Sequence, residues 1–263
     1  MALNRPITDW KGKRVWLVGA STGIGEALAR QLDAQGCQQV LSARSADKLA
    51  ALAKDLNQAM AVPVDIADEH AVEQAARVAL QYLEGIDLVV LMAGTYAEMA
   101  IENFDLTEVK RQVNVNLNGT LHVLAQVLPV VMQQRAGHIA VVSSVAGYRG
   151  LPNSLAYGPT KAALINLAEA LYVELKPHGV GVSLINPGFV DTPLTRKNTF
   201  PMPFIIGADK AASEIIYGLE AGEFETHFPK TFTRSLRAMR LMPYSLYFSA
   251  VKRFAKTQPP GTD

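Results

Sequence analysis

The chain has 263 residues, of which 49% are hydrophobic and 19% charged, with a formal net charge of +1 at pH 7. This composition supports a large apolar core and excludes a disordered or fibrous chain. The single cysteine excludes an intramolecular disulfide, and the five scattered histidines show no spacing that predicts a metal site. No apolar run approaches the roughly 18 residues of a membrane span, and the first residues form no apolar signal core, so we expect a cytoplasmic protein.

Short apolar runs alternate with helix-forming stretches along the chain. The apolar runs predict strands at residues 15–18, 40–42, 62–64, 88–92, 139–143, 182–186 and 225–228. Helical patterns between them are expected at about 24–35, 45–57, 68–83, 107–134, 155–176 and 208–221. This alternation predicts an α/β fold, a Rossmann-type doubly wound parallel sheet of about seven strands with helices on both faces.

A glycine-rich loop follows the first expected strand. It runs from Gly19 to Gly25 as GASTGIG and leads directly into a helix. Glycine permits a tight turn and a close backbone approach to a ligand, and the helix N-terminus offers unpaired N–H groups to a pyrophosphate. Because strand, loop and helix come in the order that the motif needs, we expect a dinucleotide site here rather than an ordinary tight turn.

The end of the second strand bears on which dinucleotide binds. NAD sites usually have an acid here for the ribose 2′-hydroxyl, whereas NADP sites use an arginine for the 2′-phosphate. The sequence reads Ser42-Ala43-Arg44-Ser45 and contains no acid. Arg44 can pair with a phosphate, and Ser42 or Ser45 can donate a hydrogen bond, which favours NADP(H) over NAD(H). The alternative is that Arg44 is an exposed residue at the start of a helix.

A tyrosine, a lysine and a serine suggest acid–base chemistry. Tyr157 and Lys161 are four residues apart, so they share one face if both lie on a helix. A nearby ammonium favours the phenolate and lowers the phenol pKa from about 10, which makes the tyrosine a usable acid or base for a carbonyl or alcohol. Ser144 ends the fifth expected strand, at the sheet edge where open α/β folds bind ligands.

Together these motifs resemble the short-chain dehydrogenase/reductase (SDR) family over about residues 12–228. The residues that carry the resemblance are spread along the chain; they are the glycine loop, Asp65, Asn116, Ser143-Ser144, Tyr157, Lys161, Asn186-Pro187-Gly188 and Thr192.

The resemblance implies a catalytic set and a cofactor-binding set. Tyr157 is expected to be the general acid in reduction and the base in oxidation, with Lys161 lowering its pKa and holding the nicotinamide ribose. Ser144 is expected to hydrogen-bond the substrate oxygen, and Asn116 to hold a water that links Lys161 to solvent. The implied cofactor contacts are Gly19, Ser21, Thr22, Gly23, Ile24, Gly25, Arg44, Asp65 and Ile66 (adenine), Ala93, Gly94, Tyr157, Lys161, Pro187, Gly188, Val190 and Thr192 (carboxamide).

Two positions depart from the family pattern. The first strand ends in Val18-Gly19, where the family commonly has Thr-Gly. The fourth strand ends in Leu91-Met92-Ala93-Gly94, where it commonly has Asn-Asn-Ala-Gly. Met92 removes an asparagine hydrogen bond, so stability or cofactor affinity is expected to differ, but no catalytic position is lost.

The loop after Thr192, which covers the substrate in this family, is strongly apolar. It carries Phe200, Met202, Phe204, Ile205 and Ile206. These residues suggest a lipophilic carbonyl substrate such as an oxoacyl, steroid-like or aromatic ketone. The alternative is that they pack onto the body or onto a partner subunit.

The C-terminal residues 229–263 form a basic extension to the expected dinucleotide-binding domain of residues 1–228. No Asp or Glu occurs between Thr226 and Thr262, and the seven basic residues there are Lys230, Arg234, Arg237, Arg240, Lys252, Arg253 and Lys256. Apolar residues recur at helical spacing, at positions 232, 236 and 239 and at positions 247, 251 and 254, so two basic amphipathic helices are expected. Docking on the acidic body or a sister subunit is favoured over peripheral membrane contact, and no nucleic acid is expected because no reading motif is present.

The leading interpretation is an NADP(H)-dependent ketone reductase or alcohol dehydrogenase acting on a small-molecule substrate. The alternatives are a family member that reduces a C=C bond and a non-catalytic dinucleotide sensor, which would not need the complete proton path. The family resemblance also implies a homodimer or homotetramer, built on the two long helices at about 107–134 and 155–176.

Overall fold

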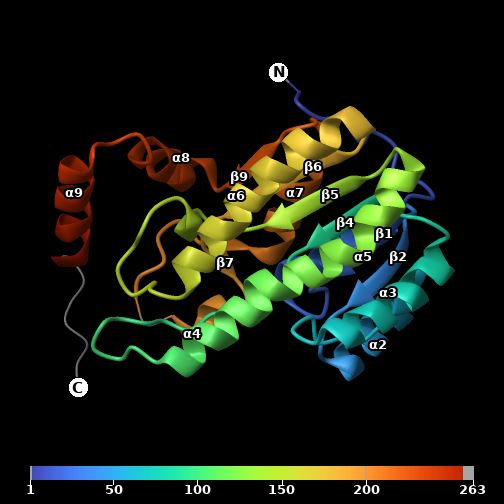
Figure 1. Cartoon of the computed structure of the whole chain (residues 1–263), viewed down its shortest axis with the longest axis horizontal. Helices are drawn as coiled ribbons and strands as arrows, with labels where there is room; N and C mark the ends of the chain where they lie inside the picture. Colours follow the sequence, from blue (N-terminus) through green and yellow to red (C-terminus); the bar gives the residue numbers. More distant parts are fainter. Residues whose placement is uncertain (1, 199, 257–263) are drawn as a thin grey trace.

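The fold is known from a computed structural model that describes residues 2–198 and 200–256 (Figure 1). Its strands are β1 (Arg14–Val18), β2 (Gln38–Ser42), β3 (Ala59–Ala61), β4 (Leu88–Leu91), β5 (His138–Val142), β6 (Gly181–Pro187), β7 (Val190–Asp191), β8 (Ile206–Gly207) and β9 (Glu225–Phe228). Its α-helices are α1 (Gly23–Ala34), α2 (Ala46–Asp55), α3 (Glu69–Leu83), α4 (Leu106–Val113), α5 (Gly119–Gln134), α6 (Tyr157–Leu175), α7 (Ala208–Glu220), α8 (Lys230–Met239) and α9 (Tyr244–Lys256).

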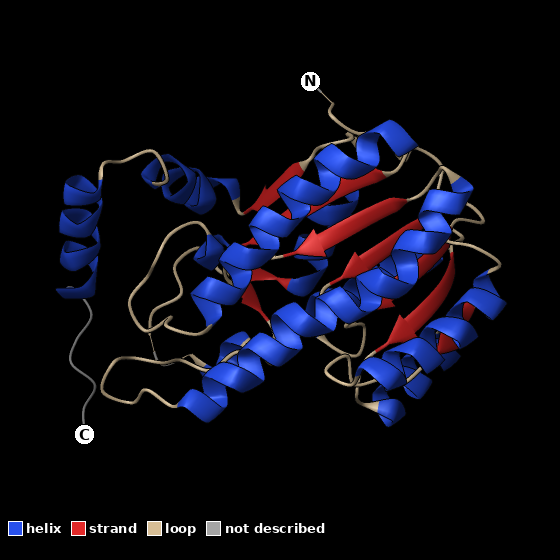
Figure 2. Ribbon diagram, viewed as in Figure 1, coloured by secondary structure: helices blue, strands red, loops and turns tan. Residues whose placement is uncertain are grey.

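The predicted doubly wound parallel sheet is confirmed. Seven strands lie in the order β3-β2-β1-β4-β5-β6-β9, and every neighbouring pair is parallel. The order reverses beside β1, so the crevice for a ligand is expected outside the carboxyl ends of β1 and β4. Figure 2 shows the strands in red with helices in blue in front of and behind them.

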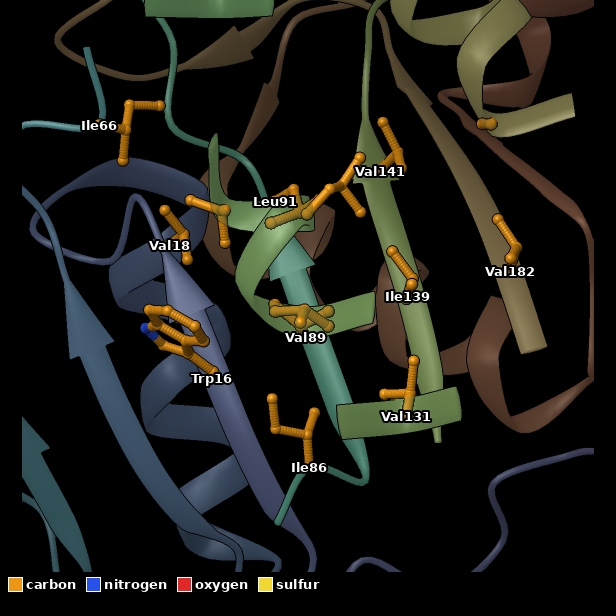
Figure 3. Close-up of a cluster of buried hydrophobic side chains, with 14 of the residues drawn as sticks. Trp16, Val18, Ile66, Ile86, Val89, Leu91, Val131, Ile139, Val141 and Val182 are labelled. Atoms are coloured by element: carbon orange, nitrogen blue, oxygen red, sulfur yellow. The ribbon is translucent and has the colours of Figure 1, made fainter. Parts of the chain in front are cut away.

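Alternate residues of the central strands face two separate apolar cores. Trp16, Val18, Val89 and Leu91 point to the face that α3, α5 and α6 cover, and Figure 3 shows them packed with Ile139, Val141 and Val182. The residues between them, such as Val15, Leu17, Leu88 and Val90, point to the face that α1, α2 and α7 cover. Burial on both faces explains why the strands are continuously apolar rather than alternating with polar residues.

The third strand and the long fourth helix differ from expectation. The regular strand lies at β3 rather than at 62–64, although Val62 and Val64 still donate to the carbonyls of Leu41 and Ala43. Pro63 between them is tolerated because β3 is the edge strand and the nitrogen of residue 63 faces away from β2. The helix spans 106–134 as expected but contains a π-helical turn, η1, at Asn114–Asn118. The sheet of β7 and β8 closes the apolar loop after Thr192, and no pattern predicted it.

The helical run from α4 through α5 is apolar and long. Within the described residues, Leu106–Gln134 is long and apolar enough to cross a membrane by length and composition. Its residues Val123, Leu124, Val127 and Val131 are buried against the sheet. The run therefore serves as a core helix of the α/β layer.

The two expected helices of the C-terminal extension are present and have different surroundings. Figure 1 places α8 beside the sheet and α9 farther out, beyond the carboxyl ends of the strands. Thr233 of α8 is fully buried against the body, whereas most described side chains of α9 are exposed. Of the residues in the second amphipathic pattern, the side chains of Arg253, Phe254 and Lys256 lie outside the described part.

Candidate active site

A cleft of about 410 Å³ runs across the carboxyl ends of the central strands. It is lined by the segments that follow β1, β2, β3, β4, β5 and β6, as the reversal in strand order predicts. The structure brings every predicted cofactor contact into this lining: Gly19, Ser21, Thr22, Gly23, Ile24, Gly25, Arg44, Asp65, Ile66, Ala93, Gly94, Tyr157, Lys161, Pro187, Gly188, Val190 and Thr192.

Three glycines of the glycine loop occupy positions where a larger residue would collide with neighbouring atoms. A Cβ at Gly25 would collide with the carbonyl oxygen of Gly19, and a Cβ at Gly19 would lie 2.6 Å from the Ala93 nitrogen. Gly23 has φ +60°, and its Cβ would lie 2.8 Å from the Thr192 side chain. The backbone thus leaves a smooth floor that ends at the N-terminus of α1, where unpaired N–H groups favour a pyrophosphate. This geometry fits a dinucleotide.

The end of the cleft beside β2 is positively charged. Arg44 and Ser45 line it, together with Lys48 from the first turn of α2, which the sequence reasoning missed. Lys48 follows Arg44 by four residues, and that spacing was the available signal. Ser42, in contrast, is buried, and its hydroxyl accepts a hydrogen bond of 3.0 Å from the Trp16 indole. Ser45 is therefore the better placed of the two serines to meet a ligand.

Met92 lines the middle of the cleft. Its side chain packs against the apolar core that includes Leu17 and Val90. Its backbone nitrogen donates a hydrogen bond to the Val18 carbonyl over 2.9 Å. The backbone connection between β1 and β4 is therefore made without an asparagine side chain.

Tyr157 and Lys161 lie on the first turn of α6, with Lys161 Nζ 5.6 Å from the centre of the Tyr157 ring. Two contacts hold this turn against β5. The Ser143 hydroxyl donates to the Lys161 carbonyl over 2.7 Å, and Lys161 Nζ donates to the Val142 carbonyl over 3.1 Å. Gly147 permits the approach, because a Cβ there would lie 2.6 Å from the Lys161 carbonyl carbon.

Ser144 completes this group from the end of β5. Its hydroxyl accepts from the Ala146 nitrogen over 3.1 Å, donates to the Pro187 carbonyl over 3.5 Å, and lies close enough to the Tyr157 phenol to lower the pKa of that group. Ser144, Tyr157 and Lys161 therefore meet at one end of the cleft although they come from two elements. A carbonyl oxygen placed here would face two hydroxyl groups.

Burial dominates the electrostatics of this group. It raises the pKa of Tyr157 to about 12, while the Ser144 hydrogen bond lowers it. Burial also lowers the pKa of Lys161 to about 8. The expected depression of the phenol pKa by the ammonium is therefore absent in the protein alone, because desolvation of the buried phenolate is the larger effect. At neutral pH the tyrosine carries its proton.

Asn116 lies behind the cleft rather than in its lining. Its side-chain amide is fully engaged: Oδ1 accepts from the Thr95 nitrogen over 2.7 Å, and Nδ2 donates to the Thr95 carbonyl and the Thr160 hydroxyl. A Cβ at Gly94 would lie 3.3 Å from Asn116 Oδ1 and 3.7 Å from Lys161 Nζ, so the two residues flank the same point. Asn116 lies in the π turn η1, a feature that often marks functional sites.

An aromatic cluster, the aromatic wall, lies behind Gly188, which lines the cleft. Phe189 stacks on Phe232 of α8 with ring centres 5.4 Å apart, and Phe200 and Phe204 pack against these two rings. A Cβ at Gly188 would lie 3.1 Å from the Phe232 ring. Of the other apolar loop residues, Ile206 packs on the body while Ile205 is exposed. No sequence pattern indicated that Phe232 packs behind Gly188, because it lies about 40 residues farther along the chain.

Tyr96 is a second aromatic neighbour of the catalytic group. Its ring meets that of Tyr157 edge to face, with centres 5.0 Å apart. Burial, followed by Glu98, raises the pKa of Tyr96 to about 12. Tyr96 was not predicted, since it lies in an irregular segment after β4.

Comparisons with known proteins agree with this geometry. A family model described as short chain dehydrogenase matches residues 13–201. An uncharacterized oxidoreductase of Staphylococcus epidermidis is 35% identical over 210 residues, which cover 80% of this chain and 91% of that protein. An uncharacterized oxidoreductase of Myxococcus xanthus is 34% identical over 242 residues, which cover 90% of this chain and 95% of that protein.

Solved structures show the same fold at lower identity. A short chain dehydrogenase/reductase from Burkholderia phymatum, in complex with NAD, has a TM-score of 0.81 and 22% identity over 97% of this chain and 98% of that chain. A 3-ketoacyl-(acyl-carrier-protein) reductase from Brucella melitensis, complexed with NADH, has a TM-score of 0.77 and 24% identity over 85% of this chain and 100% of that chain.

Proposed function

The chain belongs to the short-chain dehydrogenase/reductase family of oxidoreductases, and from this premise we propose that it interconverts a carbonyl and a secondary alcohol with NADP(H). The observation that carries the proposal is the meeting of Ser144, Tyr157 and Lys161 at one end of a cleft floored by the glycine loop. The dinucleotide, when bound, supplies or accepts the hydride. Position and proton transfer are the tasks of the protein.

Tyr157 is the proposed acid or base. Its pKa of about 12 keeps the phenol protonated at neutral pH, so it can donate to the oxygen of a carbonyl held by the Ser144 hydroxyl. Lys161, with a pKa of about 8, remains largely protonated at neutral pH and stabilises the phenolate left behind. This resting protonation favours the reductive direction.

Asn116 is proposed to act through its main chain in the proton relay. Its side-chain amide is already bonded to Thr95 and Thr160, so it has little capacity left for a water. Its carbonyl oxygen lies in the π turn, where the regular helical hydrogen bonding changes, and accepts from the Thr120 hydroxyl over 2.9 Å, so we propose this oxygen as the one that holds a water beside Lys161.

NADP(H) is proposed over NAD(H) because of the charge at the β2 end of the cleft. Arg44 and Lys48 both line this end, and neither makes an ion pair among the described residues. The strand β2 ends in Ser42 without an acid that would bind a ribose 2′-hydroxyl. Two cations beside a ribose suit a 2′-phosphate.

A lipophilic substrate is supported by the aromatic wall. Phe189, Phe200, Phe204 and Phe232 pack together behind Gly188, which lines the cleft. Apolar, aromatic-lined clefts with a few polar groups suit apolar ligands oriented by one reactive oxygen. A medium- or long-chain or aromatic ketone is the proposed class.

Residues 1–228 are proposed to form the catalytic domain, and residues 229–263 an extension that contributes Phe232. We expect a cytoplasmic homodimer or homotetramer assembled through α5 and α6. The outer faces of these helices carry exposed apolar residues, including Leu121 and Val173, the latter 68% exposed.

Calorimetric titration of NADPH and NADH tests the cofactor choice. Wild type is expected to bind NADPH at least about tenfold more tightly, and Arg44→Ala/Lys48→Ala to lose that preference, because charge-assisted hydrogen bonds to the phosphate are removed. Lys54→Ala, which removes an exposed cation of α2 outside the cleft, is the matched control. Equal binding of NADH by wild type would contradict the assignment.

A panel of ketones and activated alkenes then tests the reaction. NADPH oxidation with lipophilic ketones supports the proposal. Turnover of activated alkenes alone would indicate C=C reduction, and tight cofactor binding without turnover of any substrate would indicate a sensor.

A further inference from the structure

The C-terminal extension divides into a helix that several residues hold against the body and a helix with few contacts to it. Arg237 of α8 pairs with Glu225 at 3.1 Å and donates to His227 over 2.9 Å. Glu225 also accepts hydrogen bonds from Tyr148 and Asn186, so α8 is held by a polar network as well as by Phe232. The acidic body has therefore neutralised part of the positive charge of α8.

The helix α9 has a narrow attachment to the body. Tyr247 is 2% exposed, and its hydroxyl donates to the Gly150 carbonyl over 2.6 Å. The Arg149 guanidinium lies over the rings of Tyr247 and Tyr244, at 4.0 and 4.9 Å from their centres. These contacts orient α9 but leave most of its described surface open.

The open surface around α9 is apolar to an extent unusual for exposed residues. Leu241 is 89% exposed, and four more large apolar residues follow within the next seven positions: Met242, Tyr244, Leu246 and Phe248. Exposed apolar residues scattered singly need no explanation, but a contiguous group marks an interaction surface. We name residues 241–248 the apolar knuckle.

The apolar knuckle lies on the side of the molecule where the cleft opens. Figure 1 places α9 beyond the carboxyl ends of the strands, and the loops after β4, β5 and β6 emerge at the same edge. These loops also expose large apolar side chains: Ile101, Phe104, Leu155, Phe204 and Ile205. The mouth of the cleft and the knuckle therefore form one apolar-rich side.

The positive charge near the apolar knuckle indicates what kind of surface it contacts. The extension has no acidic residue from Thr226 to Thr262, and its exposed cations Arg234 and Lys252 make no ion pair among the described residues. Exposed Leu, Tyr and Phe side chains combined with uncompensated lysine and arginine are the features of helices that lie in the interface of an anionic bilayer. The loop at 101–106 carries Glu102 and Asp105, so the electrostatic attraction is confined to the α8–α9 side.

We propose that the apolar knuckle docks the protein on the surface of a membrane that contains anionic lipids, with the cleft mouth facing the bilayer. A lipophilic substrate could then enter the cleft from the bilayer without crossing water. Docking itself does not depend on the reaction or on the cofactor, so it stands or falls separately from the proposed function.

Co-sedimentation with vesicles tests the proposal on the full-length protein. Binding to vesicles of phosphatidylcholine mixed with phosphatidylglycerol is expected to exceed binding to phosphatidylcholine alone, and to weaken as salt is added. Leu241→Ser/Leu246→Ser should lower the partition coefficient at least about tenfold, because two apolar side chains are removed from the interface. Neither residue makes a contact that would disturb the fold, and circular dichroism checks this.

Val78→Ser is the matched control, since Val78 is 44% exposed on α3, far from α9 in Figure 1. It should bind vesicles like wild type. Absence of wild-type binding to anionic vesicles, or equal binding by the double variant, would overturn the proposal. If wild type ignores vesicles and the double variant lowers the assembly mass in sedimentation velocity, the knuckle is instead a contact between copies of this chain.

Discussion

The cofactor end of the cleft and the C-terminal extension are held in place by different kinds of contact. At the cofactor end, the backbone segments of the glycine loop pack so closely that a Cβ at Gly25 would collide with Gly19. In the extension, side chains such as Phe232 and Arg237 reach the body across a long stretch of sequence. The first kind of contact tolerates almost no substitution, whereas the second can be altered while the fold remains.

This difference suggests a division of labour. The cofactor end is specified by backbone conformation, which suits a ligand held through its pyrophosphate. The extension is specified by replaceable side chains, which suits recognition of a particular substrate or surface. Variants in each region, and in the catalytic group between them, test this division.

Tyr157→Phe should have the largest effect on activity. Removing the phenolic proton donor should lower kcat by about 10²–10⁴-fold, while NADPH affinity measured by calorimetry stays unchanged. Tyr96→Phe removes the neighbouring phenol, which touches Tyr157 only through its ring, and should retain most of the activity. Comparable loss in both variants would show that the aromatic pair, and not the Tyr157 hydroxyl, is what matters.

Gly25→Ala should abolish dinucleotide binding and destabilise the fold. The added methyl must displace the Gly19 carbonyl and lies 2.9 Å from Ala20 Cα, a strain of about 1–3 kcal/mol or more in thermal or urea unfolding. Gly150→Ala is the control, because nothing lies within 4 Å of a Cβ there. Unchanged NADPH affinity in Gly25→Ala would contradict the tight fit of the glycine loop.

Phe232→Ala should separate substrate binding from cofactor binding. Truncating this half-buried ring removes support from Phe189 and Gly188, so the KM for a lipophilic ketone should rise about tenfold, and stability should fall by about 1–3 kcal/mol. The affinity for NADPH should change little. Phe248→Ala removes an equal ring from α9, away from the cleft, and its KM should match wild type. If Phe232→Ala leaves the KM unchanged, the extension does not contribute to substrate binding.

Acidification should have the smallest of the expected effects: the stability of the fold should change little near neutral pH and fall progressively at lower pH. Burial lowers the pKa of His138 to about 4, from about 6.5 in the unfolded chain. The unfolded state therefore binds the extra proton first, so the stabilisation is complete above pH 6.5 and is lost as the pH falls toward 4. Burial, followed by Arg237, also lowers the pKa of His227, so the docking of α8 weakens in the same direction.

The measurement is the melting temperature as a function of pH in wild type and His138→Gln. The variant should show a shallower loss between pH 6.5 and 4, whereas His70→Gln, which alters an exposed histidine of α3, should follow wild type. Parallel curves for all three proteins would assign the acid sensitivity to other groups.

Much of the catalytic machinery could be predicted because it consists of short motifs. The glycine loop, the Tyr157–Lys161 spacing and the end of β5 are each contained within a few residues, and the strand order then brings them together. Lys48 was missed because its role depends on how α2 starts, and the phenol pKa was misjudged because burial is a property of the whole fold. The regular strand lies at 59–61, just before the apolar run at 62–64 that predicted it.

The sequence by itself indicated most of the helices and strands, the parallel sheet and the chemistry-bearing residues, because periodicity and local motifs depend on neighbours along the chain. Only the tertiary structure decided which parts of the extension dock. Phe232 packs on Phe189 and Arg237 pairs with Glu225, both distant in sequence, whereas Leu241 and Leu246 remain 89% and 61% exposed. Amphipathic spacing indicates that a helix has an apolar side. Which residues that side packs against depends on the shape and charge of surfaces that only the folded chain brings together.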